Sequence, residues 1–323
     1  MMRLSVLASS SRGNASVISA GGITLMVDAG ISALRIRKGL EECGLGVPSL
    51  DGIFLTHEHH DHICGLGVLS KKDKLHLYCS RYLVSELRGG MAHSTAFTCM
   101  EHGSCVQVGE VAVTAFGVRH DAYEPFGYVF EYDGKKLGYL TDTGTVTPDI
   151  LRRLAGVDAL YVESNYDPEM LENSGRAPSL IDRICGDWGH LSNGQACDLV
   201  RQLAHPGLQH VVLGHLSPEC NTPRLATMAM QSTLDELGLA SCRLHCAPMA
   251  NRLPWWKLFD KSDLFQQYVL YEVCSFSYSD RCVVGWYSRR RCLCRFCPCG
   301  DTDPAGWLHY PLLTEDTQRT SLA

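Results

Sequence analysis

Four potential metal ligands lie within a stretch of six residues. The segment THEHHDH at 56–62 contains His57, His59, Asp61 and His62 in the pattern H-x-H-x-D-H, directly after an apolar run. Neutral imidazoles and carboxylates are good ligands for zinc and manganese. In an extended segment His57 and His59 project to the same side and can reach one ion, whereas Asp61 and His62 can face a second. A solvated polar loop is the alternative, but it does not explain so dense a set of ligands.

Three further candidates end apolar strands elsewhere in the chain. His120 follows VAVTAFGVR, Asp142 ends KLGYLTD, and His215 ends HVVLGH. Ionisable groups at the ends of apolar strands are where an α/β scaffold places chemistry. Taken alone, either histidine is more readily explained as a surface residue or a satisfied core residue. Together with the 57–62 motif, the three residues predict the remaining ligands of a metal pair.

The elements expected to position these groups alternate between strand and helix, which is typical of an α/β fold. Apolar runs bounded by turn residues predict a hairpin around Gly21-Gly22 and strands at 4–8, 51–56, 111–118, 126–132, 136–142, 159–164 and 210–215. A further turn is expected at Asp133-Gly134. Helical spacing is found at 31–43, 167–185, 192–204 and 223–238, and a helix is expected to end near Ser70.

The composition is that of a folded globular protein. The chain has 323 residues, of which 45% are hydrophobic and 20% charged, and its formal net charge is −6. This charge argues against a generally basic surface but allows a local basic groove. Because there is no run of about 18 apolar residues and no long apolar start, we expect a cytoplasmic protein without a membrane span. The 16 cysteines are unevenly placed and do not suggest a disulfide framework.

The character of the sequence changes near Pro254. We therefore expect one domain over 1–253 and a separate Cys-rich tail over 254–323. The tail has poor periodicity, which favours a poorly ordered or non-native extension. Its C-x-C-x₂-C-x-C motif at 292–299 leaves open a metal-binding appendage, because thiolates suit zinc or an iron–sulfur cluster. A packed extra element is the third alternative.

Several motifs carry a resemblance to a known family. THEHHDH, HDAYEPFGYVF, LTDTG and VVLGHLS resemble the successive motifs of the metallo-β-lactamase fold superfamily. Further blocks, among them LASSSRGNASVI, VDAG, YVESNYDPEML, GHLSNGQA and GHLSPECNTP, resemble the YycJ/WalJ-like metallohydrolases, which are regarded as DNA-processing exonucleases. The resemblance covers about residues 3–250. It implies an α/β metallo-β-lactamase fold, a four-layer αββα sandwich, for the domain at 1–253, with 254–323 as an atypical extension.

The resemblance also implies how the ligands divide between two divalent ions. One ion would be held by His57, His59 and His120, and the other by Asp61, His62 and His215. Asp142 would bridge them, opposite a water or hydroxide that attacks the phosphodiester. Asp61 would in addition orient this water and accept its proton.

A Glu–His pair resembles one that related phosphodiesterases use near the leaving group. Glu163 ends the strand ALYVES, and His190 opens the block GHLSNGQA. A carboxylate raises the pKa of a neighbouring imidazole and holds its tautomer, so a charged His190 can protonate a departing sugar oxygen. A histidine preceding the helix at Ser192 and a solvated acid at a strand end are the alternatives.

Substrate contacts are expected from the loop after the first strand. Its Ser9, Ser11 and Asn14 can offer hydroxyl and N–H groups to a phosphate, although an ordinary turn is also possible. A nucleic acid needs cations along its track. The candidate cations, each also explained by a solvated face, are Arg35, Arg37, Lys38, Lys71, Lys72, Lys74, Lys135 and Lys136.

The sequence thus predicts a hydrolase that uses two zinc or manganese ions to cleave nucleic acid, as an exonuclease acting on DNA ends. A hydrolase of the same fold acting on a small ester, lactone or thioester is the first alternative. Glu163 and His190 argue against it, because carbonyl chemistry does not need them. A metal-loaded regulatory protein without turnover is the second, and the intact ligand set argues against it.

Overall fold

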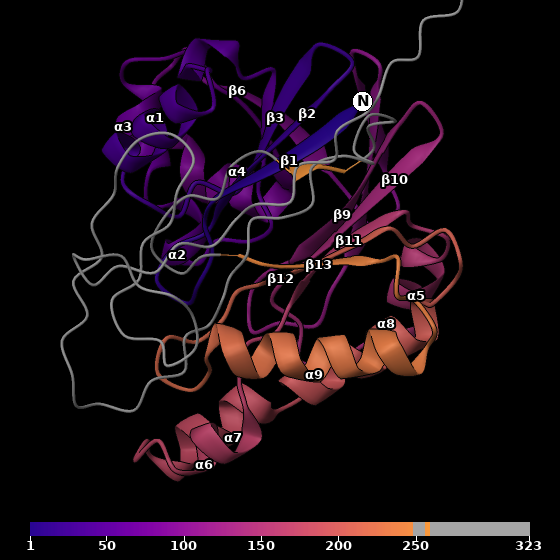
Figure 1. The fold of residues 1–323 in the computed structure, drawn as a ribbon. Helices are drawn as coiled ribbons and strands as arrows, with labels where there is room; N and C mark the ends of the chain where they lie inside the picture. The colour runs from indigo at the N-terminus through magenta and orange to yellow at the C-terminus, as the bar shows by residue number, and fades with distance from the viewer. Residues whose placement is uncertain (248–255, 259–323) are drawn as a thin grey trace, which may run out of the picture. The chain divides into compact units, whose positions relative to one another are not determined.

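The computed structural model describes residues 1–247 and 256–258, which contain two seven-stranded sheets (Figure 1). The first sheet has the order β14 (Trp256–Lys257), β1 (Met2–Ala8), β2 (Ala15–Ala20), β3 (Ile23–Val27), β4 (Gly52–Phe54), β5 (His76–Ser80), β6 (Ala96–Met100). The second has the order β13 (Arg243–Cys246), β12 (His210–Gly214), β11 (Ala159–Glu163), β10 (Lys135–Leu140), β9 (Phe126–Tyr132), β8 (Val111–Gly117), β7 (Cys105–Val108).

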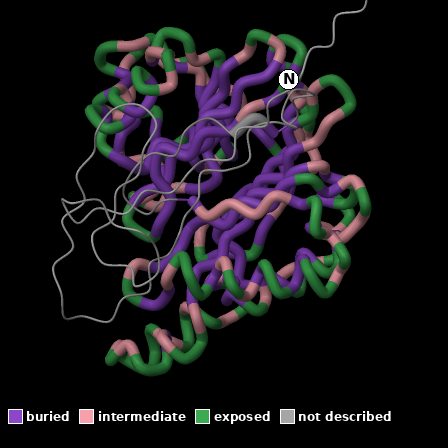
Figure 2. Tube along the Cα trace, viewed as in Figure 1, coloured by how far each residue is buried: buried purple, intermediate pink, exposed green. Residues whose placement is uncertain are grey.

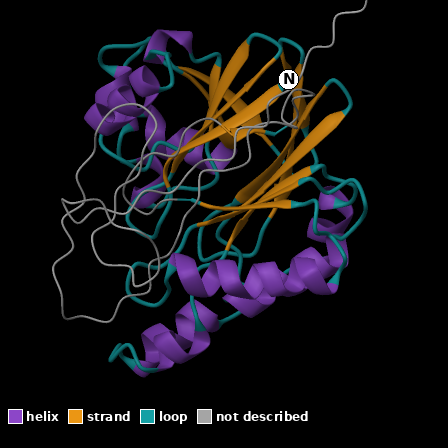
Figure 3. Cartoon of the chain, viewed as in Figure 1, coloured by secondary structure: helices purple, strands orange, loops and turns teal. Residues whose placement is uncertain are grey.

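Helices cover the outer face of each sheet, which gives the four layers of an αββα sandwich (Figure 3). The first sheet packs against α1 (Ala33–Glu42), α3 (Leu66–Ser70) and α4 (Arg81–Arg88). The second packs against α5 (Pro148–Leu154), α8 (Asn193–Leu203) and α9 (Pro223–Glu236). The remaining short elements are η1 (Val47–Ser49), α2 (His60–Ile63), α6 (Pro168–Glu172) and α7 (Pro178–Cys185). The mixed α/β class and the fold expected from the sequence are confirmed.

The core lies in three layers that follow from the alternating sides of the strands. Between the sheets, the ring of Phe54 stacks on Tyr78 with 4.4 Å between centroids, and Tyr128 and Phe130 pack edge-on against Phe54. Two further clusters join the outer sheet faces to their helices. The central strands of both sheets are therefore buried on two faces, as Figure 2 shows by their purple colour, whereas the edge strand β13 is only half-buried.

Strand direction brings polar residues to one edge of the sandwich. β10, β11 and β12 run parallel, so the residues at their carboxyl ends, Asp142, Glu163 and His215, share the same edge. β3 and β4 also run parallel in the other sheet, and they are followed by Asp28 and by the segment that begins at His57. Parallel strands thus collect ionisable groups that are far apart in the sequence.

The expected turns are present, whereas two expected helices are broken. The hairpins at Gly21-Gly22 and Asp133-Gly134 form with positive φ at each residue. The helix expected at 167–185 is two helices, α6 and α7, because Gly175 takes a φ of 71° and Pro178 forces Ala177 out of helical geometry. The helix expected to end near Ser70 is likewise divided into α2 and α3. Among the described residues, every helix is too short or too polar to cross a membrane.

One short strand lies beyond the domain boundary expected at residue 253. Trp256 and Lys257 form β14 and pair antiparallel with Leu4 and Arg3 of β1. Leu258 follows and is only 1% exposed within the core between the sheets. The other residues of 254–323, including the cysteine motif at 292–299, lie outside the described part of the chain, so the nature of the tail stays a prediction.

A substitution at Leu258 tests whether this segment belongs to the folded domain. Leu258→Ala should lower the free energy of unfolding by about 2–5 kcal/mol, because it leaves a cavity in the core between the sheets. The control is Leu34→Ala on α1, where the side chain is exposed and the loss should stay within about 0.5 kcal/mol. Urea unfolding of both variants measures the difference, and equal small losses would contradict the packing of Leu258.

Candidate active site

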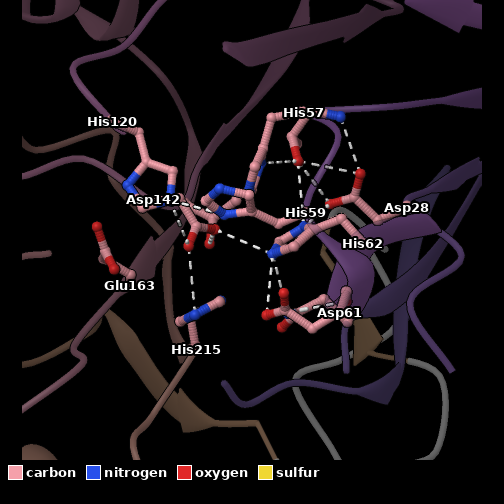
Figure 4. A network of polar contacts seen from close by, with 12 residues as sticks. Asp28, His57, His59, Asp61, His62, His120, Asp142, Glu163 and His215 are labelled. Atoms are coloured by element: carbon pink, nitrogen blue, oxygen red, sulfur yellow. Dashed lines mark hydrogen bonds and ion pairs between the residues drawn. The ribbon is translucent and has the colours of Figure 1, made fainter. Parts of the chain in front are cut away.

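Three histidines form the first group of potential ligands. His57 and His59 come from the loop between β4 and α2, and His120 follows β8 (Figure 4). Each offers a ring nitrogen within 4.8 Å of the others. His120 Nε2 lies 3.3 Å from His59 Nδ1, and His120 Nδ1 is 3.1 Å from the carbonyl oxygen of Gly189, which can accept its proton and fix the tautomer.

A second group combines Asp61, His62 and His215. Their potential ligand atoms also lie within 4.8 Å of one another. His62 Nε2 is 3.4 Å from Asp61 Oδ2, and the rings of His62 and His215 stack with 5.6 Å between centroids. The structure therefore collects the two sets of three that the family resemblance implies, and their assignment as ligands stays a prediction.

Asp142 lies between the two groups (Figure 4). Its Oδ1 is 3.3 Å from His215 Nε2 and 3.8 Å from His120 Nε2, and its Oδ2 is 3.4 Å from His62 Nε2. The Thr141 hydroxyl donates to Oδ2 at 2.7 Å and holds the carboxylate in place. A carboxylate that faces histidines of both groups has the position that a shared ligand requires.

The donor atoms fit divalent ions. His57 Nε2 and His215 Nδ1 are buried and have no hydrogen-bond partner among the described residues, although buried polar atoms normally have one. Burial lowers the pKa of His57, His120 and His215, which keeps these imidazoles neutral, as ligands must be. His57 Nδ1 is 3.0 Å from the Thr56 hydroxyl, so its other nitrogen remains for an ion.

The field at the site favours positive charge. Burial works against a charged His62, but the carboxylates of Asp142 and Asp28 outweigh it and hold the pKa of His62 well above its usual value. Burial likewise opposes ionisation of Asp142, yet His215 and His62 hold the pKa of this carboxyl well below its usual value. A pocket that stabilises a proton among several carboxylates will also stabilise a divalent cation there.

Asp28 supports His62 and was not singled out as a site residue from the sequence. It is fully buried after β3, and its Oδ2 lies 2.8 Å from His62 Nδ1. The Thr56 N–H donates to the other carboxylate oxygen at 2.8 Å. A carboxylate behind a ligating histidine orients the ring and leaves Nε2 for the metal. The sequence signal was the VDAG block after an apolar strand, which contributed only to the family resemblance.

Glu163 and His190 form the expected pair beside Asp142. His190 Nδ1 is 3.0 Å from Glu163 Oε2 and 3.5 Å from Asp142 Oδ1. Glu163 is fully buried, and its other oxygen accepts from the Thr143 N–H at 2.6 Å. Burial opposes the charged imidazole, but Glu163 outweighs it and raises the pKa of His190 to about 9. His190 therefore has the protonation state of an acid at neutral pH, although it also lies within 4.8 Å of His120 and Asp142 as a potential ligand.

The loop after β1 supports the two groups of potential ligands. Ser9 is buried, its hydroxyl lies 2.6 Å from that of Tyr161, and it accepts from the His215 N–H at 2.6 Å. The Asn14 N–H donates to the Asp61 carbonyl at 2.8 Å. Of the three residues expected to touch substrate, only Ser11 lines the cavity. The positions of Ser9 and Asn14 favour holding the loop, and their contact with substrate stays a prediction.

A cavity of about 410 Å³ opens above these groups. Three arginines line it, namely Arg12, Arg176 and Arg183, together with Leu180 and Ile184 of α7. None of the cations expected from the sequence lines this cavity; Arg37 pairs with Asp73 and Lys135 with Asp158 instead. Arg12 lies within the LASSSRGNASVI block but was not predicted as a substrate contact, and no local pattern marks Arg176 or Arg183.

Comparisons with known proteins agree with this architecture. Residues 24–216 match the family described as the beta-lactamase superfamily domain. The chain is 36% identical over 241 residues to exodeoxyribonuclease YycJ of Bacillus anthracis and 35% identical over 241 residues to exodeoxyribonuclease WalJ of Streptococcus pneumoniae. Each alignment covers 73% of this chain and 90% of the relative.

Solved structures show the same fold at low sequence identity. The metallo-beta-lactamase fold protein YhfI from Bacillus subtilis superposes with a TM-score of 0.61 at 15% identity, covering 78% of this chain and 99% of YhfI. A diphosphatase from the PhnP family gives a TM-score of 0.57 at 16% identity, covering 79% of this chain and 98% of that protein. At these identities the likeness establishes the fold alone.

Removing the charge behind His62 should weaken metal binding. Asp28→Asn should reduce metal affinity about 10- to 100-fold, because the ring of His62 loses its orienting carboxylate. Competition with a chromophoric chelator measures the affinity. The control is Asp51→Asn, because Asp51 also accepts a backbone hydrogen bond, from Thr24 at 2.8 Å, but is not one of the site carboxylates. Equal affinities for the two variants would remove Asp28 from the support of the site.

Asp142 allows a test of metal number. We expect two divalent ions per reconstituted chain and at most one in Asp142→Ala, because this carboxylate faces both groups of ligands. Elemental analysis after removal of free metal gives the stoichiometry. Asp149→Ala on α5, where the side chain is partly exposed and pairs with Arg152, should keep both ions. An Asp142→Ala chain that retained two ions and full activity would exclude a shared ligand at this position.

Proposed function

The chain belongs to the β-lactamase superfamily, in the family of the exodeoxyribonucleases YycJ and WalJ, and from this premise we propose that it is a two-metal phosphodiesterase acting as an exonuclease on DNA ends. It is a metal-dependent hydrolase that uses divalent metal ions. We propose in addition that the site holds two ions, of zinc or manganese, and that the bond cleaved is a phosphodiester at a DNA end.

The observation that carries the proposal is the Glu163–His190 pair. It stands beside Asp142 and outside the two groups of three, and the 19% exposed side chain of His190 reaches the cavity. Hydrolysis of a phosphodiester expels a sugar alkoxide, a poor leaving group that gains from protonation. Opening a lactone or thioester does not need a protonated histidine such as His190 beside the metal ligands.

The side chains divide the work of the reaction. When bound, two divalent ions would lower the pKa of a water and neutralise charge on the phosphate oxygens. The hydrogen bond to His62 lowers the pKa of Asp61 against the effect of burial, so this carboxylate is ionised at neutral pH and could orient a water at the site and take up its proton. His190 delivers a proton to the departing oxygen, and Glu163 holds the imidazole in its tautomer.

The cavity supports a polyanionic substrate. Its three arginines exceed by one the two carboxylates that pair with them, Glu219 and Asp121, so the rim carries a small positive charge although the net charge of the chain is −6. A local basic rim on an acidic protein suits binding that is directed by the site. The relatives named exodeoxyribonucleases support DNA as the substrate, and a small ester or lactone remains the alternative that an assay can exclude.

Replacing His190 tests the nuclease proposal. His190→Ala should slow cleavage of end-labelled DNA about 10²–10⁴-fold, the usual contribution of general acid catalysis, and should keep both metal ions. A nitrophenyl phosphodiester needs little protonation of its leaving group, so the defect should shrink on it. Equal defects on both substrates would exclude the acid role. Robust lactone or thioester hydrolysis without DNA cleavage would favour the alternative.

Glu163→Gln provides the matched test on the same pair. Since Glu163 raises the pKa of His190 to about 9, the acid is protonated at neutral pH and is lost as the pH rises through that value. Without the carboxylate the pKa of His190 falls, so the basic limb of the pH–rate profile should move to lower pH. An unmoved limb would mean that another group titrates there.

A further inference from the structure

Two arginines at the rim of the cavity share a single carboxylate. Arg12 lies in the loop after β1, and its Nη2 is 3.2 Å from Glu219 Oε1. Arg176 lies between α6 and α7, and its Nη2 is 2.8 Å from Glu219 Oε2. The three residues are brought together from segments that are more than 40 positions apart in the sequence, and all three line the cavity that contains the candidate metal ligands.

The arrangement leaves positive charge uncompensated. Two guanidinium groups face one carboxylate, so the cluster carries a net charge of about +1 by ordinary ionisation. These arginines also hold the pKa of Glu219 below its usual value, so the carboxylate is charged at neutral pH. Ion pairs as exposed as Arg12 with Glu219 contribute little to stability, and tying the loops together is therefore a weak reason for the cluster.

The arginines are already oriented toward a shared anion. Both guanidinium groups point at Glu219, and the Arg176 side chain is only 24% exposed. The backbone N–H groups of Arg12 and Arg176 donate to the hydroxyls of Ser10 and Ser174, which holds the two loop segments that carry them. Guanidinium groups match phosphate oxygens as well as carboxylate oxygens, and a phosphate offers more acceptors and more charge. A phosphate can therefore take the place of the Glu219 carboxylate between the two arginines.

The cluster lies beside the second group of ligands. Glu219 follows His215 by four residues, and Arg12 precedes Asn14, which binds the Asp61 carbonyl. The third arginine, Arg183, is at the other group, because it pairs with Asp121 next to His120. A phosphate between Arg12 and Arg176 would thus occupy the cavity next to the bond that is cleaved.

We infer that Arg12, Arg176 and Glu219 form a second phosphate subsite, which receives the phosphate adjacent to the scissile phosphodiester and is blocked by Glu219 until substrate arrives. This inference rests on the proposed phosphodiesterase function and adds a preference among its substrates. The subsite takes the phosphate of a neighbouring nucleotide or a terminal phosphate monoester. A substrate with a single phosphodiester and no other phosphate leaves it empty.

Four short substrates separate these sources of phosphate. They are a thymidine dinucleotide with one phosphodiester, the same dinucleotide with a 5′-phosphate or with a 3′-phosphate, and the trinucleotide with two phosphodiesters. The metal-loaded enzyme should have a higher kcat/KM for at least one phosphate-bearing substrate than for the dinucleotide, by about 10- to 100-fold if two charge-assisted contacts form. The preferred substrate identifies the source.

Variants expected to change the substrate preference in opposite directions distinguish a phosphate subsite from ion pairs that only hold the loops together. Arg12→Gln and Arg176→Gln should each lower the preference for the added phosphate, whereas Glu219→Gln should raise it by removing the competing carboxylate. Loosened loops would instead shift all three variants in the same direction. Arg152→Gln is the control, because Arg152 pairs with Asp149 on α5 and does not line the cavity. It should keep the wild-type preference.

Binding gives a readout that does not depend on turnover. Fluorescence anisotropy with a labelled oligothymidylate should show weaker binding for the two arginine variants and tighter binding for Glu219→Gln. The slope of log Kd against log salt should fall by about 0.7 for each arginine removed.

The outcomes separate this inference from the proposed function. Cleavage of phosphodiesters without preference for an added phosphate, or an unchanged Kd in Arg176→Gln, would overturn the subsite alone. If the metal-loaded enzyme cleaves no phosphodiester, not even the nitrophenyl ester, the proposed function fails, and the anisotropy series still decides whether the arginines bind phosphate.

Discussion

The buried charge of Asp142 is the constraint on which the site depends. A carboxylate enclosed at the edge of two sheets is costly unless cationic or hydrogen-bonding groups surround it. Here His62, His120 and His215 face it, and Thr141 donates to it. Of these histidines only His62 has a raised pKa, and its proton compensates only part of the charge collected by the carboxylates at the site. Divalent cations compensate it more completely, so the electrostatics and the metal chemistry lead to the same arrangement.

Three residues of the site that follow strands have an unusual backbone conformation. Asp28, Asp142 and His215 have φ values of 58°, 53° and 51°, a left-handed conformation that is uncommon for residues other than glycine. Each residue directly follows, or lies two positions after, a strand of a parallel pair. The surrounding contacts hold this geometry, for instance the Ser9 hydroxyl that accepts from the His215 N–H. The loop after β1 therefore supports the site even where it does not face the cavity.

The sequence predicts what is encoded locally. The turn at Asp133-Gly134, the strand ending in Asp142 and the cluster beginning at His57 are each contained in a few residues. Asp28 and the arginine pair were missed, because their role appears only when distant segments meet. The break between α6 and α7 was missed although its signals are local, since Gly175 and Pro178, which interrupt the helix, stand in the sequence at the junction of the two helices. The fold and the candidate metal ligands can thus be predicted from the sequence. The residues that support the ligands or line the cavity rim can be recognised only from tertiary contacts.

The candidate metal ligands and the arginines at the cavity rim also differ in the elements that carry them. Most of the ionisable groups that face Asp142 follow strands of the two sheets, where a shift in register would move buried side chains to the wrong face. The arginines lie in the first loop and in or beside the short helices α6 and α7. The local core of these two helices is a small cluster around Tyr166 and Leu171. Such segments change with little cost to the sandwich. The candidate metal ligands are therefore positioned by the sheets, whereas the arginines proposed to select the substrate lie in segments that can vary independently of them.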